Sequence, residues 1–423
     1  MTSILGNLSP FRSSSKKVST SSLNLFAPNN TPLQMRAAKL EHPPVPKVCV
    51  VTGGTGFVGQ RLVEMLVERG AEKVISFDIV PPPANAWKHE KIEWRIGDIT
   101  DKKAVEELVE GADCVWHNAA AVGPFHPKPL YFKVNYEGTL NVIDACKKAG
   151  VRKIVMSSSP STRFTGEDVD GLTEDEMPKL PLKKYLQPYA ETKAMGEVAM
   201  SEACSPELMT VSVAPHQVYG PRDNLFLPNL LEAGGTGRLR IFGEGKNRIC
   251  FTHVDNYCHG LIIAERALKP DSPALGKFYI VTDGTTHPNG EQYLIFWEIL
   301  DEAIKGMGFK SLWEKAKLPK PLLFFLAYIC EFLGWAFGTV FKLNYFNVLV
   351  LTMHRWFDIA AAEKDLDFEP IIGFREGWDE TIVWFKENWL PTFSKGSLTG
   401  INKSTQAKIN IQAKEPSADK KED

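Results

Sequence analysis

The sequence lacks the features that mark a metal site, a disulfide-stabilised secreted domain or a nucleic-acid-binding protein. Its seven cysteines are scattered, at positions 49, 114, 146, 204, 250, 258 and 330, and no C-x-x-C occurs. We interpret them as reduced thiols in a reducing compartment. No spacing of His, Cys and acidic residues suggests a metal site, and we predict none. Because the formal net charge is −2, electrostatics gives no support for a nucleic-acid partner.

Acidic residues are absent before Glu41, and the first 45 residues are rich in Ser, Asn and Pro. No apolar run there is long enough for the hydrophobic region of a secretory signal. The composition is typical of an organellar transit peptide, and a disordered leader is the alternative. In both cases we expect residues 1–45 to lie outside the fold. The polar, Lys-rich residues 395–423 are likewise predicted to be disordered.

A glycine turn between a buried strand and a helix is the main positive signal. Residues 48–52 are mostly β-branched, and apolar residues recur at helical spacing after the turn. Glycines at these positions permit a tight turn, let a pyrophosphate approach the backbone and let helix and strand pack closely. The helix N-terminus would hold the pyrophosphate, whereas the alternative is a tight turn that binds nothing. The residues predicted to bind the dinucleotide here are Gly53, Gly56, Phe57, Val58 and Gly59.

The residue that follows the second strand indicates which dinucleotide is bound. The strand at 73–77 ends in Asp78, at the distance from the glycines where an acid binds the adenosine ribose hydroxyls. A carboxylate repels a 2′-phosphate, and no Arg or Lys follows at once, so we predict NAD rather than NADP. Residues that close the next two strands are also predicted to line the cofactor site, with ordinary turn chemistry as the alternative. They are Asp98, Ile99, Asn118, Ala119 and Ala120.

Strands and helices alternate from Lys47 onward. Strands are predicted at 48–52, 73–77, 92–96, 113–116, 153–156 and 209–213, with helices near 101–110, 133–149 and 188–203. This alternation predicts an α/β fold with a doubly wound parallel sheet of the Rossmann type. We assign residues 46–290 to an NAD-binding domain. Residues 215–394, interleaved with it, form a smaller C-terminal substrate lobe.

A serine triplet and a Tyr-x-x-x-Lys pattern supply candidate catalytic residues. Ser157-Ser158-Ser159 closes the fifth strand, and Tyr189 and Lys193 lie on one face of a helix because they are four positions apart. An ammonium beside a phenol favours the phenolate and lowers the pKa of the phenol. Tyr189 is therefore predicted to exchange a proton with a substrate oxygen near neutral pH, while Lys193 also holds the nicotinamide ribose. A surface pair is the alternative.

The order and spacing of these motifs resemble the extended short-chain dehydrogenase/reductases, over most of the chain from residue 47. The segments V-N-Y-E-G-T-L-N-V-I-D-A-C at 134–146, P-H-Q-V-Y-G-P-R-D at 215–223 and G-E-G-K-N-R-I-C-F-T-H-V-D-N at 243–256 resemble the 3β-hydroxysteroid dehydrogenase branch, in particular its decarboxylating sterol-4α-carboxylate 3-dehydrogenases. The resemblance implies Tyr189 as proton donor and acceptor and Lys193 as its partner. It implies Ser159 as the assisting serine, with Ser158 as the alternative. The branch usually has Arg where this chain has Ala214.

The resemblance also implies a reaction. It is the NAD-dependent oxidation of the 3β-hydroxyl of a sterol or steroid in sterol biosynthesis. If the substrate bears a 4α-carboxylate, the product is a β-keto acid that loses CO₂ without a further catalytic group. A nucleotide-sugar epimerase or dehydratase of the same superfamily is the alternative enzyme. A non-enzymatic NAD-binding protein is the third hypothesis.

An apolar segment interrupts the C-terminal part. Residues 321–341 carry Glu331 as their only charge, and a second apolar stretch follows at 346–353. The first stretch is long enough to be a membrane-spanning helix, a monotopic insertion or a buried core helix, and a central Glu disfavours a simple span. We predict membrane association through residues 321–353, at the endoplasmic reticulum. A plastid or mitochondrion is the alternative if the leader is a transit peptide, and a homodimer is kept open.

The segment at 243–256 is predicted to form a strand and a helix start over the substrate pocket. Asp255 is interpreted as the cap of that helix rather than as a catalytic acid. His117 and His216 are interpreted as packed or loop histidines.

Overall fold

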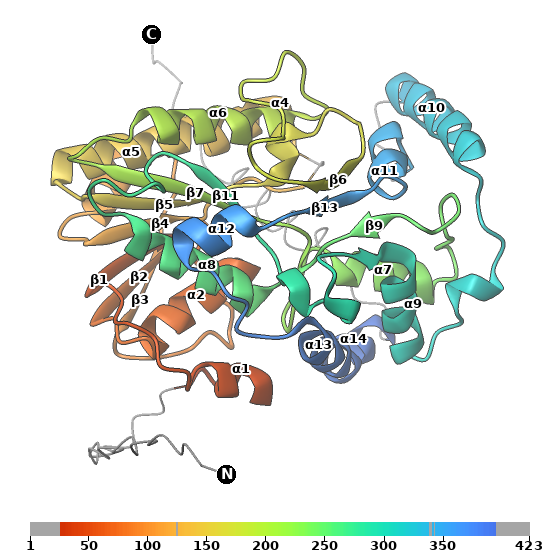
Figure 1. The fold of residues 1–423 in the computed structure, drawn as a ribbon, viewed down its shortest axis with the longest axis horizontal. Coiled ribbons are helices and arrows are strands. Elements are labelled where there is room, and N and C mark those ends of the chain that lie inside the picture. Colours follow the sequence, from red (N-terminus) through yellow and green to blue (C-terminus); the bar gives the residue numbers. More distant parts are fainter. Residues whose placement is uncertain (1–25, 124–125, 338–340, 342, 395–423) are drawn as a thin grey trace, which may run out of the picture.

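A seven-stranded parallel sheet, in the order β11-β7-β5-β4-β1-β2-β3, forms the centre of the N-terminal part (Figure 1). The computed structural model describes residues 26–123, 126–337, 341 and 343–394. Strands are added outward on both sides of β1, so a crevice lies at the carboxyl ends of β1 and β4, where open α/β sheets bind ligands. The strands are β1 (Val48–Thr52), β2 (Lys73–Asp78), β3 (Ile92–Ile96), β4 (Cys114–His117), β5 (Lys153–Ser157), β7 (Met209–Pro215) and β11 (Phe278–Val281).

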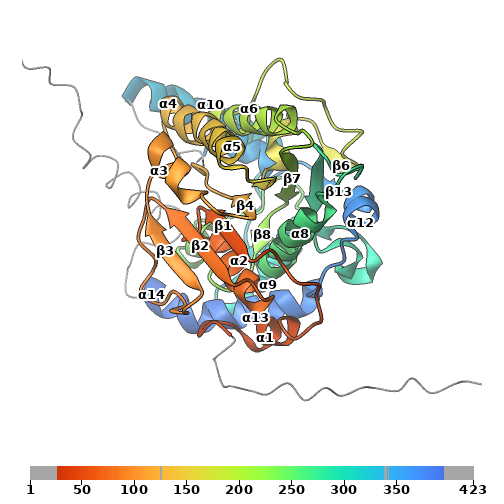
Figure 2. The same cartoon turned by 90° about the vertical axis from the view of Figure 1, so that its left-hand side faces the viewer.

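Helices cover both faces of this sheet, because successive residues of a strand point to opposite sides. Cys49 and Val51 of β1 join the core beneath α2 and α8, whereas Val50 joins the core beneath α3 and α5. Figures 1 and 2 show the two helical layers with the sheet between them. The covering helices are α2 (Phe57–Glu68), α8 (Val254–Ala267) and α12 (Ala360–Leu366) on one face, and α3 (Lys102–Leu108), α5 (Gly138–Ala149) and α6 (Pro188–Glu202) on the other.

The predicted doubly wound parallel sheet is confirmed. The bounds predicted for β1 and β3 agree with the structure, and those of the other predicted strands differ by one or two residues at an end. The sequence analysis missed β11, and the predicted helix at 133–149 is divided. Its first part is a π-helical turn, η1 (Phe132–Glu137), and its second part is α5.

A four-stranded sheet, in the order β12-β9-β13-β6, belongs to the C-terminal part. Its strands come from widely separated segments, β6 (Val169–Leu172), β9 (Arg248–Ile249), β12 (Leu294–Ile295) and β13 (Arg355–Phe357). A two-stranded parallel sheet, β8 (Val218–Tyr219) with β10 (Thr252–His253), links the parts. A second, aromatic-rich core lies among helices α7 (Leu227–Gly235), α9 (Phe296–Gly306), α13 (Phe374–Asn388) and α14 (Leu390–Ser394).

The prediction of a leader outside the fold is wrong for residues 26–45. Helix α1 (Pro32–Ala37) begins with a capping box between Thr31 and Gln34 and lies beside α13 (Figures 1 and 2). Gln34 is fully buried, and its Nε2 donates a hydrogen bond to Asp255 Oδ1 at 2.7 Å. Composition alone misses this segment because a few buried polar contacts fix it. Residues 1–25 and the predicted tail at 395–423 lie outside the described residues.

Asp255 is not the helix cap that we predicted. The cap of α8 is His253, whose Nδ1 accepts from the Asp255 N–H at 3.2 Å. The Asp255 carboxylate instead pairs with Arg61 at 2.9 Å, and both side chains are buried. An unpaired buried guanidinium would be strongly destabilising, whereas the first N–H groups of a helix can be capped by other acceptors. The carboxylate therefore stabilises the fold more beside Arg61 than it would at the helix end.

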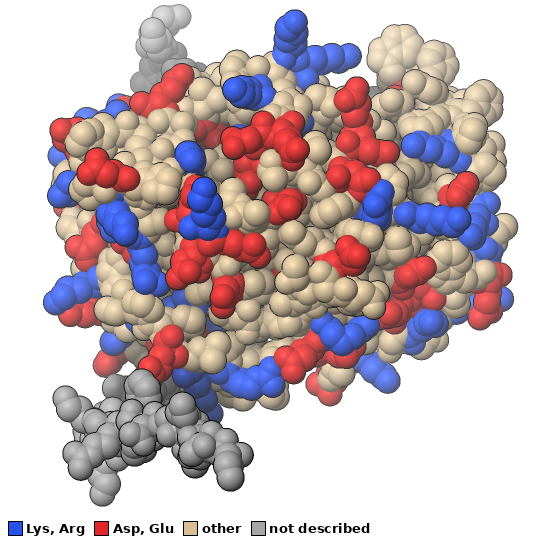
Figure 3. Space-filling model, in the orientation of Figure 1, with Lys and Arg blue, Asp and Glu red and all other residues tan. Residues whose placement is uncertain are grey.

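Helix α10 (Lys320–Phe337) lies at the edge of the molecule, where α11 (Tyr345–Val350) packs beside it (Figure 1). Its described buried residues are Leu323, Ala327 and Gly334, whereas Trp335 is 80% exposed. Most of the side chains at this corner of the surface are uncharged (Figure 3). Among the described helices, α10 alone is long and apolar enough to cross a membrane. The interpretation as a buried core helix is therefore wrong.

Candidate active site

A cavity of about 410 Å³ opens at the carboxyl edge of the central sheet and extends between the two parts of the chain. It is lined by every residue that the sequence analysis assigned to cofactor or catalysis except Gly59. Gly59 lies behind the turn, where a β-carbon would stand 2.1 Å from the Gly53 carbonyl oxygen. This close approach agrees with the predicted packing of helix against turn, and Gly59, which we also predicted to bind the dinucleotide, does not line the cavity.

The glycine turn fits a bound pyrophosphate. Gly53 has φ +69°, and a β-carbon there would stand 2.8 Å from the Ala119 backbone. Helix α2 starts after Gly56 with no side-chain cap and no acid in its first turn. Its first N–H groups are thus available to an anion at the cavity wall.

The acidic residues at this end of the cavity are held by short local hydrogen bonds. The Asp78 carboxylate accepts from the Thr55 hydroxyl at 2.7 Å and from the Thr55 N–H at 3.3 Å. Asp98 accepts from the Thr100 N–H at 2.8 Å, which fixes the turn after β3. Sequence reasoning missed Thr55, although its place inside the glycine turn was a usable signal.

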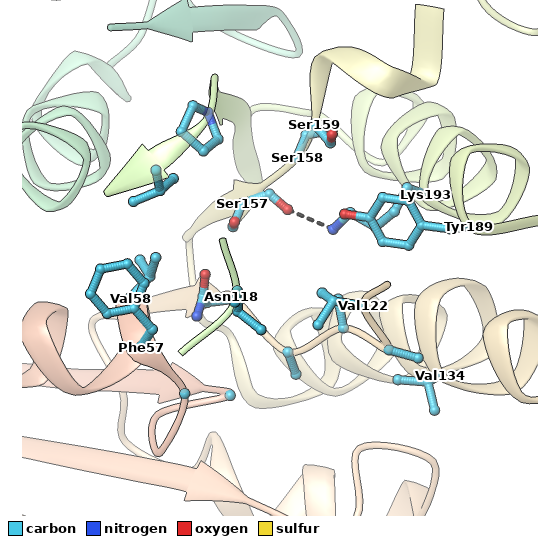
Figure 4. Close-up of a pocket in the computed structure, with 18 of the residues that line it drawn as sticks. Phe57, Val58, Asn118, Val122, Val134, Ser157, Ser158, Ser159, Tyr189 and Lys193 are labelled. Atoms are coloured by element: carbon cyan, nitrogen blue, oxygen red, sulfur yellow. Dashed lines mark hydrogen bonds between the residues drawn. The ribbon is translucent and has the colours of Figure 1, made fainter. Parts of the chain in front are cut away.

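The serine triplet and the Tyr-x-x-x-Lys pair meet at the middle of the cavity (Figure 4). Ser159 lies near the Tyr189 phenol (Figure 4), and its hydroxyl hydrogen-bonds the Ser161 hydroxyl at 2.8 Å. The Lys193 ammonium donates to the Ser157 carbonyl at 2.6 Å, which ties α6 to the end of β5. Ser158 donates instead to Glu197 at 2.5 Å, away from the phenol. This geometry favours Ser159 over Ser158 as the serine beside the tyrosine.

The titration of this group differs from the prediction. Burial raises the pKa of Tyr189 to about 12, and the nearby Ser159 hydroxyl opposes that rise. Burial lowers the pKa of Lys193 to about 8, against the attraction of Glu197. The predicted lowering of the Tyr189 pKa by the ammonium is absent in this structure, because burial outweighs the other influences on the phenol and the ammonium bonds a carbonyl.

The other end of the cavity is assembled from residues that the sequence analysis did not assign to the site. Its walls are mostly apolar, and the polar residues among them include Ser161, His216, Gln217 and Arg355. His216 had been interpreted as packed, and it is buried but lines the cavity. Ala214 is fully buried in β7 and does not line the cavity. The apolar residues at this end are Phe164, Val218, Leu225 and Phe226.

A second cavity, of about 580 Å³, lies between α6 and α10. It shares His126 and Tyr189 with the first cavity and is lined on its far side by Cys330 and Trp335 of α10. The candidate catalytic residues and the exposed apolar helix thus line neighbouring cavities. Among the described residues, no group of three His, Cys, Asp or Glu side chains is arranged to hold a metal ion.

Known proteins are similar to this chain in sequence and in fold. The 3-beta hydroxysteroid dehydrogenase/isomerase family matches residues 50–311. A sterol-4-alpha-carboxylate 3-dehydrogenase, decarboxylating, of Mus musculus is 30% identical over 347 residues, which cover 80% of this chain and 91% of the relative. A 2-alkyl-3-oxoalkanoate reductase of Stenotrophomonas maltophilia is 32% identical over 337 residues, 78% of this chain and 96% of the relative.

In fold, the chain resembles an epimerase of Methanothermobacter thermautotrophicus, with a TM-score of 0.62 at 24% identity over 82% of this chain and 94% of that one. At this identity the likeness shows the fold and not the reaction.

Proposed function

Because the chain belongs to the 3-beta hydroxysteroid dehydrogenase/isomerase family, we propose that it oxidises the 3β-hydroxyl of a 4α-carboxysterol with NAD and that the product loses CO₂. The observation that carries this proposal is the grouping of Ser159, Tyr189 and Lys193 at the centre of one cavity. One end of that cavity fits a dinucleotide, and the other end is mostly apolar.

Backbone N–H groups hold the pyrophosphate of the cofactor, and a carboxylate holds its adenosine ribose. The free N–H groups at the start of α2 bind the pyrophosphate, and Asp78 accepts the adenosine ribose hydroxyls. Asp98, Ile99, Asn118, Ala119 and Ala120 line the remaining wall of this end. NAD, when bound, supplies the acceptor for the hydride that leaves C3 of the sterol. The buried carboxylate of Asp78 disfavours a 2′-phosphate and so favours NAD over NADP.

The proton that leaves the 3β-hydroxyl goes to Tyr189. Ser159 donates a hydrogen bond to the same oxygen and keeps it beside the phenolic oxygen. With a pKa of about 12 the phenol is mostly protonated at neutral pH, so oxidation needs the cationic Lys193 and the bound cofactor to favour the phenolate. Loss of the hydride and the proton converts C3 to a carbonyl.

The resulting 3-oxo-4-carboxylate is a β-keto acid. Its bond from C4 to the carboxyl group breaks, the electron pair passes toward the C3 oxygen as an enolate, and C4 then takes up a proton. This step needs no further catalytic group. The reductase relative is named for a 3-oxoalkanoate, in which a carboxylate and an oxygen stand in the same 1,3 relation. That relation supports a β-hydroxy or β-oxo acid as the substrate class.

We further propose that α10 attaches the protein to the endoplasmic reticulum membrane, in which sterols dissolve. The helix exposes a row of large apolar residues, among them Phe325, Phe332 and Trp335. The second cavity joins α10 to Tyr189, which supports entry of the substrate from the membrane side. Glu331 accepts a hydrogen bond from the Tyr345 N–H at 2.8 Å, so its charge faces the start of α11. This contact suits a helix that lies in the interface better than one that spans the bilayer.

A substrate panel tests the proposed function. Detergent-solubilised protein is given NAD with a 4α-carboxysterol, a Δ5-3β-hydroxysteroid or UDP-glucose, and NADH and CO₂ are followed together. We expect NADH with equimolar CO₂ from the carboxysterol. NADH from the steroid alone would move the chain to a non-decarboxylating steroid dehydrogenase. Turnover of UDP-glucose alone would overturn the proposal in favour of the nucleotide-sugar alternative.

A further inference from the structure

Arg355 lies at the substrate end of the cavity and has no assigned role in the chemistry above. It begins β13, which pairs with β6 on one side and β9 on the other. The Cys250 N–H also donates to the Arg355 carbonyl at 3.3 Å, so the backbone of this residue is held on both sides. Its side chain lines the cavity that holds Ser159 and Tyr189.

The charge of Arg355 is not neutralised within the described structure. No described carboxylate forms an ion pair with it, and its Nε is buried without a hydrogen-bond partner. Its described side-chain contact is from Nη1 to His216 Nε2 at 3.4 Å. Two other guanidiniums with little exposure pair with carboxylates, Arg61 with Asp255 and Arg163 with Glu197. Arg69 resembles Arg355 in contacting a histidine, His259, but it does not line the cavity.

His216 cannot supply the missing negative charge. Its Nδ1 lies 3.0 Å from the Cys250 carbonyl oxygen and so carries the ring proton, which leaves Nε2 as an acceptor for Arg355. Burial, together with the nearby guanidinium, holds the pKa of His216 well below its usual range, so the ring is neutral. Burial lowers the pKa of Arg355 to about 10, and at neutral pH the guanidinium is still charged.

The charges that line the cavity divide by position. Its carboxylates, Asp78 and Asp98, follow β2 and β3 at the cofactor end. Its cationic side chains are Lys193, whose ammonium bonds the Ser157 carbonyl, and Arg355, which stands among the apolar residues at the other end. An unpaired guanidinium in an apolar cavity favours an anionic group on the ligand.

We propose that Arg355 binds the carboxylate of the substrate and makes the site selective for 3β-hydroxy acids over neutral 3β-hydroxysteroids. This inference rests on the proposed function. A guanidinium can bind a carboxylate through two parallel N–H groups, which fixes the carboxylate's orientation as well as its position. Decarboxylation removes the bound group, so the neutral ketone product binds more weakly than the acid and leaves the site more readily.

The test compares a 4α-carboxysterol with its methyl ester, using the detergent-solubilised full chain and NAD. We expect Arg355→Gln to raise the KM for the acid at least about tenfold, since a charge-assisted hydrogen bond is lost, and to leave the KM for the ester and for NAD unchanged. Arg355→Lys keeps the positive charge but lacks the two parallel N–H groups, so it should raise the KM for the acid less than Arg355→Gln does. Arg248→Gln, which alters a partly exposed arginine outside the cavity, should change neither substrate.

An unchanged KM for the acid in Arg355→Gln, or an equal loss for acid and ester, would overturn the inference. If Arg355→Gln does not fold, Arg355→Lys decides between the same outcomes. A binding measurement separates this inference from the proposed function. A 3-deoxy-4α-carboxysterol, which cannot be oxidised, should bind the variant at least about tenfold more weakly than it binds the unaltered protein.

That weakening would support the carboxylate site even if the unaltered protein oxidised no sterol, in which case only the proposed function fails. Equal binding of the 3-deoxy acid to the variant and the unaltered protein would overturn the carboxylate site. Weaker binding of UDP-glucose alone would overturn it too, because Arg355 would then bind phosphate.

Discussion

The two ends of the main cavity are built in different ways. The cofactor end is local in sequence, since a glycine turn and the residues that close three neighbouring strands make most of it. The substrate end is assembled from the η2 turn (Pro160–Arg163) after β5, the segment after β7, and β13, which lie far apart along the chain. Short motifs therefore specify the cofactor end, whereas the tertiary fold specifies the substrate end. The following variants should separate the functions of these ends.

Tyr189→Phe should have the largest effect, because it removes the proton-transferring oxygen and keeps the ring. NADH formation should fall by about 10²–10⁴-fold, while NAD affinity is unchanged. Steady-state turnover and NAD titration check the two halves of this prediction. Tyr279→Phe, which alters a buried tyrosine outside the cavity, is the control. Turnover of Tyr189→Phe at the rate of the unaltered protein would remove Tyr189 from the chemistry.

Asp78→Ala should weaken NAD binding and leave the catalytic step intact, the opposite of the pattern expected for Tyr189→Phe. Loss of the carboxylate at the cofactor end should weaken NAD binding by about 10–100-fold and reduce the discrimination against NADP. Turnover at saturating NAD should stay near that of the unaltered protein. Asp101→Ala, which removes the exposed cap of α3, should leave NAD affinity unchanged. A preference for NAD over NADP that survives Asp78→Ala would refute the assigned role of this acid.

The exposed apolar face of α10, which lies near the substrate end of the cavity, should attach the protein to the membrane. Exchange of Phe325, Phe332 and Trp335 together for Ser should weaken binding to phosphatidylcholine vesicles by at least about 10²-fold. Each aromatic side chain that inserts into the membrane contributes about 1.5–3 kcal/mol to the free energy of binding. Vesicle flotation measures this. Val383→Ser changes an exposed apolar residue on α13 and should have no effect. If the triple variant floats as well as the unaltered protein, α10 is not the membrane attachment.

The smallest effect should come from α1, behind the cofactor end. Gln34→Leu removes a buried hydrogen bond to Asp255 and should lower the free energy of unfolding by about 1–3 kcal/mol. Arg36→Ala, which breaks an ion pair whose side chains are 65% and 57% exposed, should cost less than about 0.5 kcal/mol. Urea unfolding compares the two variants. Equal stability of Gln34→Leu and the unaltered protein would mean that α1 contributes nothing to the fold.

The sequence predicts the central sheet and the cofactor end well, because buried parallel strands and glycine turns carry their signal within a few residues. It predicts α1 and Arg355 poorly for opposite reasons. α1 looks like a disordered leader by composition, and only the buried contact between Gln34 and Asp255 shows that it belongs to the fold. Arg355 lies in an ordinary run of residues, and its lack of a counter-charge becomes visible only when β13 takes its place between β6 and β9. The pKa of Tyr189 was mispredicted because spacing reveals the ammonium but not the burial of the phenol.

The most direct test of the proposed reaction follows the hydrogen at C3. A 4α-carboxysterol that carries deuterium at C3 is incubated with NAD and the detergent-solubilised protein, and deuterium in the nicotinamide product is compared with CO₂ release. We predict one deuteride transferred to NAD for each CO₂ released, and loss of both in Tyr189→Phe. Release of CO₂ without label in the reduced cofactor, or label that stays on the sterol, would contradict oxidation at C3 as the function of this site.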